Sequence, residues 1–230
     1  MNPIGPPPVG LLLDMDGTLI DTEPVWFAAE QAAVARFGGH LPDDAREALL
    51  GTDAQTLITL LIERYGADTD HDALVDALGE EVGSRLDEAP ALPGAAELVE
   101  AAAMAGLRCA VVSNSPALVV EATLAPHPWA QRLDVRVTAD DVLRPKPAPD
   151  LYRLGLARLG LSAADAIAIE DSPLGATAAV AAGVRCIAVP SPRAARGGFD
   201  AVTPHVARDL YEAAAWLGLA AAVGAGASAT

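Results

Sequence analysis

Two carboxylates follow the first apolar run of the sequence. In the segment LLLDMDGT, Asp14 ends the run and Asp16 comes two residues later, directly before Gly17. Glycine permits the sharp turn that would bring Asp16 back towards the same strand end. An Asp-Gly pair after a strand is also an ordinary turn, so this segment alone leaves open whether the pair is catalytic.

A second pair of carboxylates, Glu170 and Asp171, follows the apolar run AIAI and comes just before a helix-like stretch. Such residues also cap helices. If both pairs lie at one end of a sheet, up to four carboxylates share a cleft and repel one another by several kcal/mol. A hard divalent cation with oxygen ligands, above all Mg²⁺, would relieve this repulsion, and its candidate ligands are Asp14, Asp16, Glu170 and Asp171.

Two further segments could bind an anion. Ser113 and Asn114 follow an apolar run, and Pro116 lies at the start of a helix-like stretch, where backbone amides and a hydroxyl can hold an anion or simply form an N-cap. Lys146, in RPKPAPD, is the only lysine of the sequence, and every other basic residue is an arginine. A compact ammonium between prolines suits a point contact to a phosphate or carboxylate oxygen, although a single lysine can also occur there by chance.

The elements that position these residues alternate in the second half of the chain. Short apolar runs predict buried parallel strands at 9–14, 107–112, 134–138, 166–170 and 185–189. Between and after them, helix-like stretches occupy about 94–105, 116–125, 149–160, 173–182 and 205–218. This alternation predicts an α/β fold with a doubly wound, mostly parallel sheet, whose ligands bind at the carboxyl ends of the strands.

Residues 22–90 contain no strand-like run and are predicted to form consecutive amphipathic helices, broken at GG, GT and GADTD. One of these helices is expected to begin near Asp53 and Thr56 and to end at Gly66. The prediction is a core domain of residues 1–21 and 91–230 with an inserted, all-helical domain of residues 22–90. The two chain crossings between them are natural hinges.

The composition of the chain limits the kinds of molecule that we expect it to bind. The chain has 230 residues, of which 52% are hydrophobic, so it can bury a substantial core. Its formal net charge of -16 disfavours nucleic-acid and anionic-membrane partners. Cys109 and Cys186 lie in apolar runs without zinc-site spacing, which is typical of a reduced, cytoplasmic protein. The uncharged end, 213–230, is mostly Ala and Gly and is predicted to be a closing helix with a flexible tail rather than a membrane anchor. A monomer is the simplest expectation.

Taken together, DMDGT, Ser113, Lys146 and the Glu170-Asp171 pair resemble the motif set of the haloacid-dehalogenase-like hydrolase superfamily in order, strand context and spacing. The resemblance covers nearly the whole chain. The helical insertion after the first motif is similar to the cap domain of the subgroup that contains phosphoglycolate phosphatase, β-phosphoglucomutase and sugar or hexitol phosphatases.

This resemblance implies a mechanism. Asp14 would be the nucleophile that attacks phosphorus and forms an aspartyl phosphate. Asp16 would protonate the leaving alcohol and then deprotonate the water that hydrolyses the intermediate. The resemblance also implies Mg²⁺, held by Asp14, the backbone carbonyl of Asp16, Asp171 and Glu170.

The resemblance further implies how a small phosphorylated metabolite would be bound. Ser113 and Lys146 would hold the oxygens of the transferring phosphoryl group, assisted by Asn114. Apart from the resemblance, Glu23 and Thr52 of the inserted domain are candidate substrate contacts that would face the cleft, the alternative for both being a packing role. Closure of this domain would exclude bulk water.

Other activities of the same fold fit the sequence less well. A dehalogenase of this superfamily uses neither a metal nor the second aspartate, so Asp16, Glu170 and Asp171 favour phosphorus chemistry. In a mutase of the β-phosphoglucomutase type, the position of the cap-hinge histidine falls here on Trp26. The position of its cap arginine falls near Ala54, so both departures weaken that alternative.

A non-catalytic binding or regulatory module is the alternative from another class. It would be more credible if one of the key residues were replaced, but Asp14, Asp16, Lys146 and Asp171 are all present. The resemblance therefore implies a Mg²⁺-dependent phosphatase acting on a sugar, polyol or glycolate phosphate.

Overall fold

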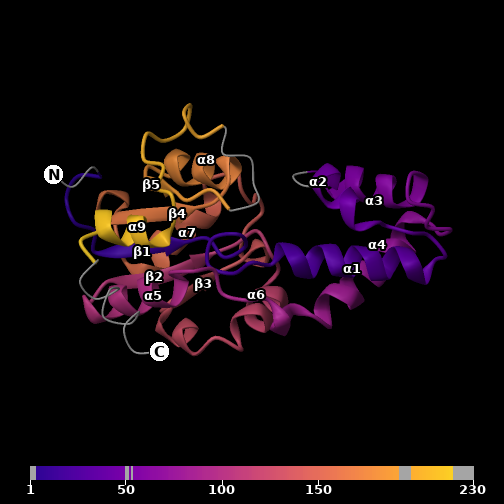
Figure 1. Cartoon of the computed structure of the whole chain (residues 1–230). Coiled ribbons are helices and arrows are strands. Elements are labelled where there is room, and N and C mark those ends of the chain that lie inside the picture. Colours follow the sequence, from indigo (N-terminus) through magenta and orange to yellow (C-terminus); the bar gives the residue numbers. More distant parts are fainter. Residues whose placement is uncertain (1–3, 50–51, 53, 192–197, 220–230) are drawn as a thin grey trace. The chain divides into compact units, whose positions relative to one another are not determined.

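Five short strands form one parallel sheet in the order β3-β2-β1-β4-β5. The computed structural model describes residues 4–49, 52, 54–191 and 198–219 (Figure 1). The strands are β1 (Gly10–Leu13), β2 (Arg108–Val112), β3 (Val135–Val137), β4 (Ala166–Glu170) and β5 (Arg185–Ala188). All five coincide with the predicted apolar runs, and the predicted doubly wound α/β fold is confirmed.

The order of the strands reverses at β1. The chain continues from β1 to β2 and β3 on one side, then returns to β4 and β5 on the other. Leu13 of β1 lies in register with Ile169 of β4, and the Asp14 amide donates to the Ile169 carbonyl over 3.0 Å. Because ligands of open α/β sheets bind where strand order reverses, the carboxyl ends of β1 and β4 mark the expected site.

Helices cover both faces of this sheet. Their bounds are α5 (Ala95–Met104), α6 (Ala117–Leu124), α7 (Asp150–Leu159), α8 (Pro173–Ala181) and α9 (Leu210–Trp216). Helices α7 and α8 pack together over one face, where alternate strand residues such as Leu12, Val112 and Ala168 are fully buried. Ser172 begins α8 as an N-cap, accepting a hydrogen bond from the Gly175 amide over 3.1 Å.

The last helix starts later than the sequence predicts. Residues 205–207 were expected to be helical, but their main chain pairs with β5: Ala188 donates to His205, and Ala207 donates to Ala188, each over 2.8 Å. A helix cannot form while these groups bond to the sheet, so α9 begins only after its N-cap, Asp209. Of the predicted closing helix and tail at 213–230, residues 220–230 lie outside the described residues. No helix in the described ranges has both the length and the apolar character that a membrane span requires.

The chain divides into two units, Met1–Asp21 with Pro90–Thr230, and Thr22–Ala89. In the described part of the second unit, all regular secondary structure is helical, and loops connect the helices. Its helices are α1 (Glu23–Arg36), α2 (Arg46–Leu49), α3 (Ala54–Glu63) and α4 (His71–Gly83), with 3-10 turns at Asp43–Ala45 and Leu86–Glu88. Helix α1 packs on α4, and α3 contacts both. Asp53, expected near the start of α3, lies outside the described residues.

The two segments that link the units run side by side. The Asp21 amide donates to the Pro90 carbonyl, and the Leu92 amide donates to the Leu19 carbonyl, each over 2.9 Å. Ile20 and Ala91 form the antiparallel bridge between them. The chain thus leaves the first unit and returns to it at one short ladder, and the hinge role expected of these crossings stays a prediction.

Candidate active site

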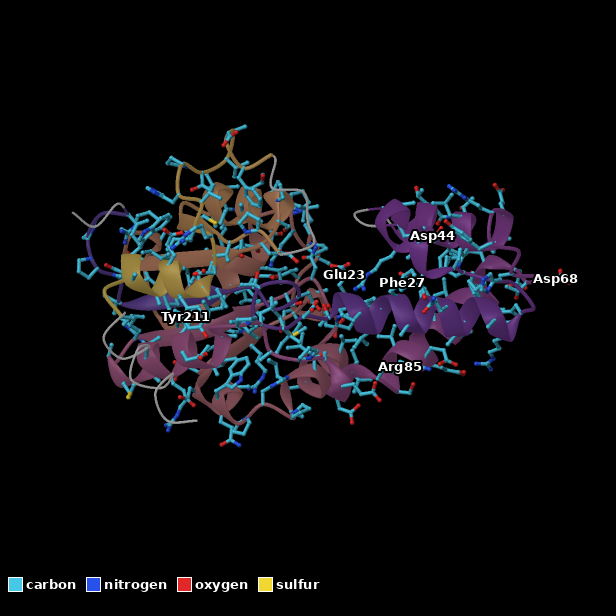
Figure 2. The ribbon with its side chains drawn as sticks, viewed as in Figure 1. Glu23, Phe27, Asp44, Asp68, Arg85 and Tyr211 are labelled. Carbon is cyan, nitrogen blue, oxygen red and sulfur yellow. The ribbon has the colours of Figure 1, made fainter. Side chains whose placement is uncertain are left out.

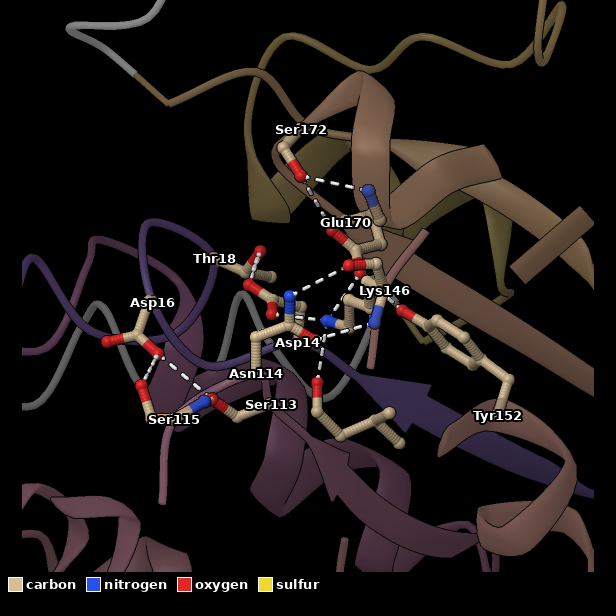
Figure 3. Close-up of polar contacts among 12 residues, drawn as sticks. Asp14, Asp16, Thr18, Ser113, Asn114, Ser115, Lys146, Tyr152, Glu170 and Ser172 are labelled. Atoms are coloured by element: carbon tan, nitrogen blue, oxygen red, sulfur yellow. Dashed lines mark hydrogen bonds and ion pairs between the residues drawn. The ribbon is translucent and has the colours of Figure 1, made fainter. Parts of the chain in front are cut away.

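Asp14 directly follows β1 and is only 6% exposed. Its Oδ1 accepts from the Lys146 ammonium over 2.7 Å, and its Oδ2 accepts from the Thr18 hydroxyl over 2.8 Å (Figure 3). Each carboxylate oxygen can accept more than one hydrogen bond, so both retain capacity for a further partner. The structure therefore presents Asp14 as a carboxyl group held in one orientation at the switch point of the sheet.

Lys146 is 7% exposed, and its ammonium has an acceptor for each of its three protons. The acceptors are Asp14 Oδ1 at 2.7 Å, Glu170 Oε1 at 2.7 Å and the Val112 carbonyl at 2.8 Å. Burial alone would lower the pKa of Lys146, but the two carboxylates outweigh it and hold the pKa above its ordinary value. The only lysine of the chain is thus a charged, fully bonded group between two acidic side chains.

Both polar atoms of the Asn114 side chain form hydrogen bonds with the main chain of Lys146. Its Nδ2 donates to the Lys146 carbonyl over 3.1 Å, and its Oδ1 accepts from the Lys146 amide over 2.8 Å. The side chain therefore fixes the loop that carries the ammonium. The predicted contact of Asn114 with substrate stays a prediction.

Two serine hydroxyls converge on one oxygen of Asp16. Ser113 and Ser115 each donate to Asp16 Oδ2 over 3.0 Å, and the Ser113 hydroxyl also accepts from the Ser115 amide over 2.9 Å. Ser113 is fully buried and lies just after β2. In this structure its proton is directed at Asp16, and its expected role in binding a phosphoryl oxygen stays a prediction.

Glu170, the last residue of β4, is fully buried. Its Oε1 accepts from both Lys146 and the hydroxyl of Tyr152 on α7. Burial raises the pKa of Glu170 to about 7 despite the neighbouring ammonium. Gly175 is needed beside it, because a Cβ there would lie 2.1 Å from both carboxylate oxygens.

Asp171 follows Glu170 and adds a third carboxylate to the group. One oxygen each of Asp14, Glu170 and Asp171 lies within 4.8 Å of the others. Gly17, at φ +79°, makes room for this side chain, since a Cβ at that position would lie 2.3 Å from Asp171 Oδ2. Burial, followed by the charges of Asp14 and Glu170, raises the pKa of Asp171 to about 9.

This group of oxygens fits a divalent cation. Three carboxylates that close repel one another, and this repulsion adds to the effect of burial in raising the pKa of Asp171. Their oxygen donors are the kind that Mg²⁺ prefers. Among the predicted ligands, Asp16 contributes no side-chain oxygen to the group.

The two predicted substrate contacts of the inserted segment lie in the second unit. Glu23 begins α1, and its Oε1 accepts from Arg46 Nε over 3.0 Å (Figure 2). The Thr52 hydroxyl donates to the Leu49 carbonyl over 2.8 Å. Both are partly buried, and their contact with substrate stays a prediction.

Three residues of the site, Thr18, Ser115 and Tyr152, were not predicted from the sequence. Thr18 lies within the first motif, and Ser115 lies two residues after Ser113, so proximity in sequence could have suggested both. Tyr152 could not be recognised in this way, since a tyrosine among the leucines of a helix is typical of core packing.

Comparison with known proteins agrees with this geometry. The family model of the haloacid dehalogenase-like hydrolases matches residues 11–189. Fructose-1-phosphate phosphatase YqaB of Escherichia coli (strain K12) is 35% identical over 183 residues, covering 78% of this chain and 95% of that protein. Hexitol phosphatase B of the same strain is 30% identical over 191 residues, covering 80% and 84%.

A solved structure is similar along nearly the whole chain. The crystal structure of CbbY from Rhodobacter sphaeroides in complex with phosphate matches with a TM-score of 0.76 at 29% identity, covering 92% of this chain and 99% of that one. The motifs, the sheet order and these matches agree, and the chain belongs to the haloacid dehalogenase-like hydrolase family.

Proposed function

We propose that this protein is a Mg²⁺-dependent phosphatase that hydrolyses a small phosphomonoester through an aspartyl phosphate on Asp14. The observation that carries the proposal is the convergence of three carboxylates, within 4.8 Å, beside one buried ammonium at the switch point of the sheet. A nucleophilic carboxylate, a counterion and a cation site together are what phosphoryl transfer needs.

The first step is the attack of an Asp14 oxygen on phosphorus. The bond from Asp14 to phosphorus forms as the bond to the leaving oxygen breaks, and Asp16 gives that oxygen its proton. Lys146 holds the orientation of Asp14 and offsets negative charge beside it. Mg²⁺, held by Asp14, Glu170, Asp171 and the carbonyl of Asp16, would supply further charge stabilisation.

The second step regenerates the enzyme. Asp16, now a carboxylate, takes a proton from water, whose oxygen attacks phosphorus. The bond between phosphorus and Asp14 breaks, which releases inorganic phosphate. The hydroxyls of Ser113 and Ser115 support both roles of Asp16, because they hold its carboxyl group in one orientation.

The substrate class that we propose is a sugar or polyol phosphate. Two relatives that each cover more than three quarters of this chain are named as phosphatases of fructose 1-phosphate and of hexitol phosphates. The similar CbbY structure holds phosphate. These names support the class without identifying the ester.

Phosphate release from a panel of metabolites tests the proposal. Purified protein is incubated with fructose 1-phosphate, hexitol phosphates, pentose phosphates and phosphoglycolate, in Mg²⁺ and in excess chelator. We expect inorganic phosphate from at least one sugar or polyol ester, only with Mg²⁺, and none from the isosteric variant Asp14→Asn.

Two results would point elsewhere. A product that keeps its phosphate at a new position would favour the mutase, and no release from any ester would favour a binding module. Release by Asp14→Asn at the wild-type rate would contradict the assignment of the nucleophile.

A further inference from the structure

Tyr152 contacts Lys146 and Glu170, two of the groups beside Asp14, although nothing in the proposed mechanism uses it. The side chain is fully buried on α7, and its hydroxyl donates to Glu170 Oε1 (Figure 3). The Lys146 ammonium lies over its ring, 5.4 Å from the ring centroid, within the range of a cation–π contact. A buried tyrosine hydroxyl needs a partner, but here the partner is a carboxylate of the proposed metal site.

The two oxygens of Glu170 have unequal surroundings. Oε1 accepts from two donors, Tyr152 and Lys146. Among the described residues, Oε2 accepts only from the Ser172 hydroxyl, at the long distance of 3.4 Å, and that hydroxyl also accepts from the Gly175 amide. A carboxylate bound so firmly at one oxygen cannot rotate freely, and its other oxygen keeps the capacity to bind a cation.

Lys146 alone cannot fix this orientation. Its three protons are shared among Asp14, Glu170 and the Val112 carbonyl, so it directs only one proton to Glu170. A single hydrogen bond leaves a carboxylate free to turn about that contact. The Tyr152 hydroxyl supplies a second donor to the same oxygen, from helix α7, and removes this freedom.

We infer that Tyr152 is a positioning residue, which orients Glu170 so that one carboxylate oxygen is held by Tyr152 and Lys146 while the other is presented to Mg²⁺. The inference rests on the proposed function, because it assumes that Glu170 takes part in binding the metal. Partners that orient metal ligands in this way contribute about 10- to 100-fold to metal affinity.

The test is a double-mutant cycle on Mg²⁺ binding, measured by calorimetry on the whole protein without substrate. Tyr152→Phe keeps the ring and its packing and removes only the hydroxyl. We expect it to weaken Mg²⁺ binding about 10- to 100-fold. In a Glu170→Gln background, the same change should have no further effect on affinity, because Tyr152 acts through the Glu170 carboxylate.

Tyr211→Phe is the matched control, since the Tyr211 hydroxyl also donates to a glutamate, Glu97, over 3.0 Å, but on the surface. It should leave Mg²⁺ affinity unchanged. In turnover assays, Tyr152→Phe should raise the Mg²⁺ concentration needed for half-maximal rate, with kcat largely restored at saturating Mg²⁺. Simple loss of packing would not be reversed by metal.

The outcomes separate this inference from the proposed function. If wild-type protein binds Mg²⁺ and Tyr152→Phe binds it equally well, the inference is wrong and the proposed metal site stands. An equal loss of affinity in the wild-type and the Glu170→Gln backgrounds would show that Tyr152 does not act through this carboxylate. If the wild-type protein binds no Mg²⁺, the metal in the proposed function fails and the inference fails with it.

Discussion

Two serine hydroxyls hold Asp16 at one carboxylate oxygen. Its proposed role is to give a proton to the leaving oxygen in the first step and to take one from water in the second. This predicts different effects of Asp16→Asn on the two steps. With p-nitrophenyl phosphate, the leaving group departs without a proton, so the first step should survive. The second step needs a base, so steady-state turnover should fall about 10²- to 10⁴-fold.

Rapid-mixing kinetics with this substrate would show a burst of about one nitrophenolate per enzyme, followed by slow release. Asp14→Asn, which lacks the nucleophile, should give no burst. Wild-type steady-state turnover by Asp16→Asn would contradict the acid–base role.

The raised pKa of Glu30, in the second unit, predicts that the stability of the protein depends on pH. The residue lies on α1, is 8% exposed, and has its pKa raised to about 7, chiefly by burial and against the opposing charge of Arg46. The folded protein therefore holds this proton more tightly than the unfolded chain, whose value is about 4.5. The contribution of protonated Glu30 to the free energy of unfolding is fully present below about pH 4.5 and is lost as the pH rises through about 7.

Glu30→Gln keeps the shape and cannot ionise. We expect the variant to be more stable than wild type at pH 8, by at most on the order of 3 kcal/mol, and nearly equal to it at pH 4. Urea unfolding of both proteins at the two pH values measures the difference. A difference that does not change with pH would show that Glu30 is not the titrating group.

Among the helices and strands, the sequence was sufficient to predict those elements whose position is determined by burial. Strands buried on both faces appear as short apolar runs, so the strand ends that carry Asp14 and Glu170 could be located. The pairing of His205 with β5 could not, because it depends on main-chain hydrogen bonds to a distant strand rather than on local propensity. Likewise, the Asn114 amide binds main chain, which no pattern of side chains reveals.

The first turn of α8 depends on a glycine that the sequence presents as an ordinary helical residue. A Cβ at Gly175 would lie 2.1 Å from the Glu170 carboxylate, so either the helix or the carboxylate must shift. We expect Gly175→Ala to lower the free energy of unfolding by about 1–3 kcal/mol, as overpacking does. It should also weaken Mg²⁺ binding.

Gly79→Ala provides the control, since a Cβ at Gly79 in α4 would meet nothing within 4 Å. Alanine costs less backbone entropy than glycine in a helix, so this variant should be stabilised by about 0.5–1 kcal/mol. Denaturant unfolding of the two variants should thus give changes of opposite sign. Stabilisation by Gly175→Ala would contradict the close approach of α8 and Glu170.

At the scale of the whole molecule, the charge is strongly unbalanced. The formal net charge is -16, and part of the negative charge is buried at the ends of β1 and β4 rather than spread over the surface. Salt screens exposed charges, but it acts much less on buried ones. A monovalent salt and a divalent cation that enters the site should therefore stabilise the protein to different extents.

Thermal unfolding in MgCl₂ and in NaCl at matched ionic strength measures this difference. At a Mg²⁺ concentration about 100 times the dissociation constant, binding to the folded state adds about 2.7 kcal/mol, which corresponds to a rise in Tm of about 5–10 °C over NaCl. Asp171→Asn removes one of the three clustered carboxylates and should lose most of this rise, although it relieves repulsion and gains stability in NaCl. If NaCl raised the Tm of wild-type protein as far as MgCl₂ does, the effect would be general screening and no specific cation site would be needed to explain it.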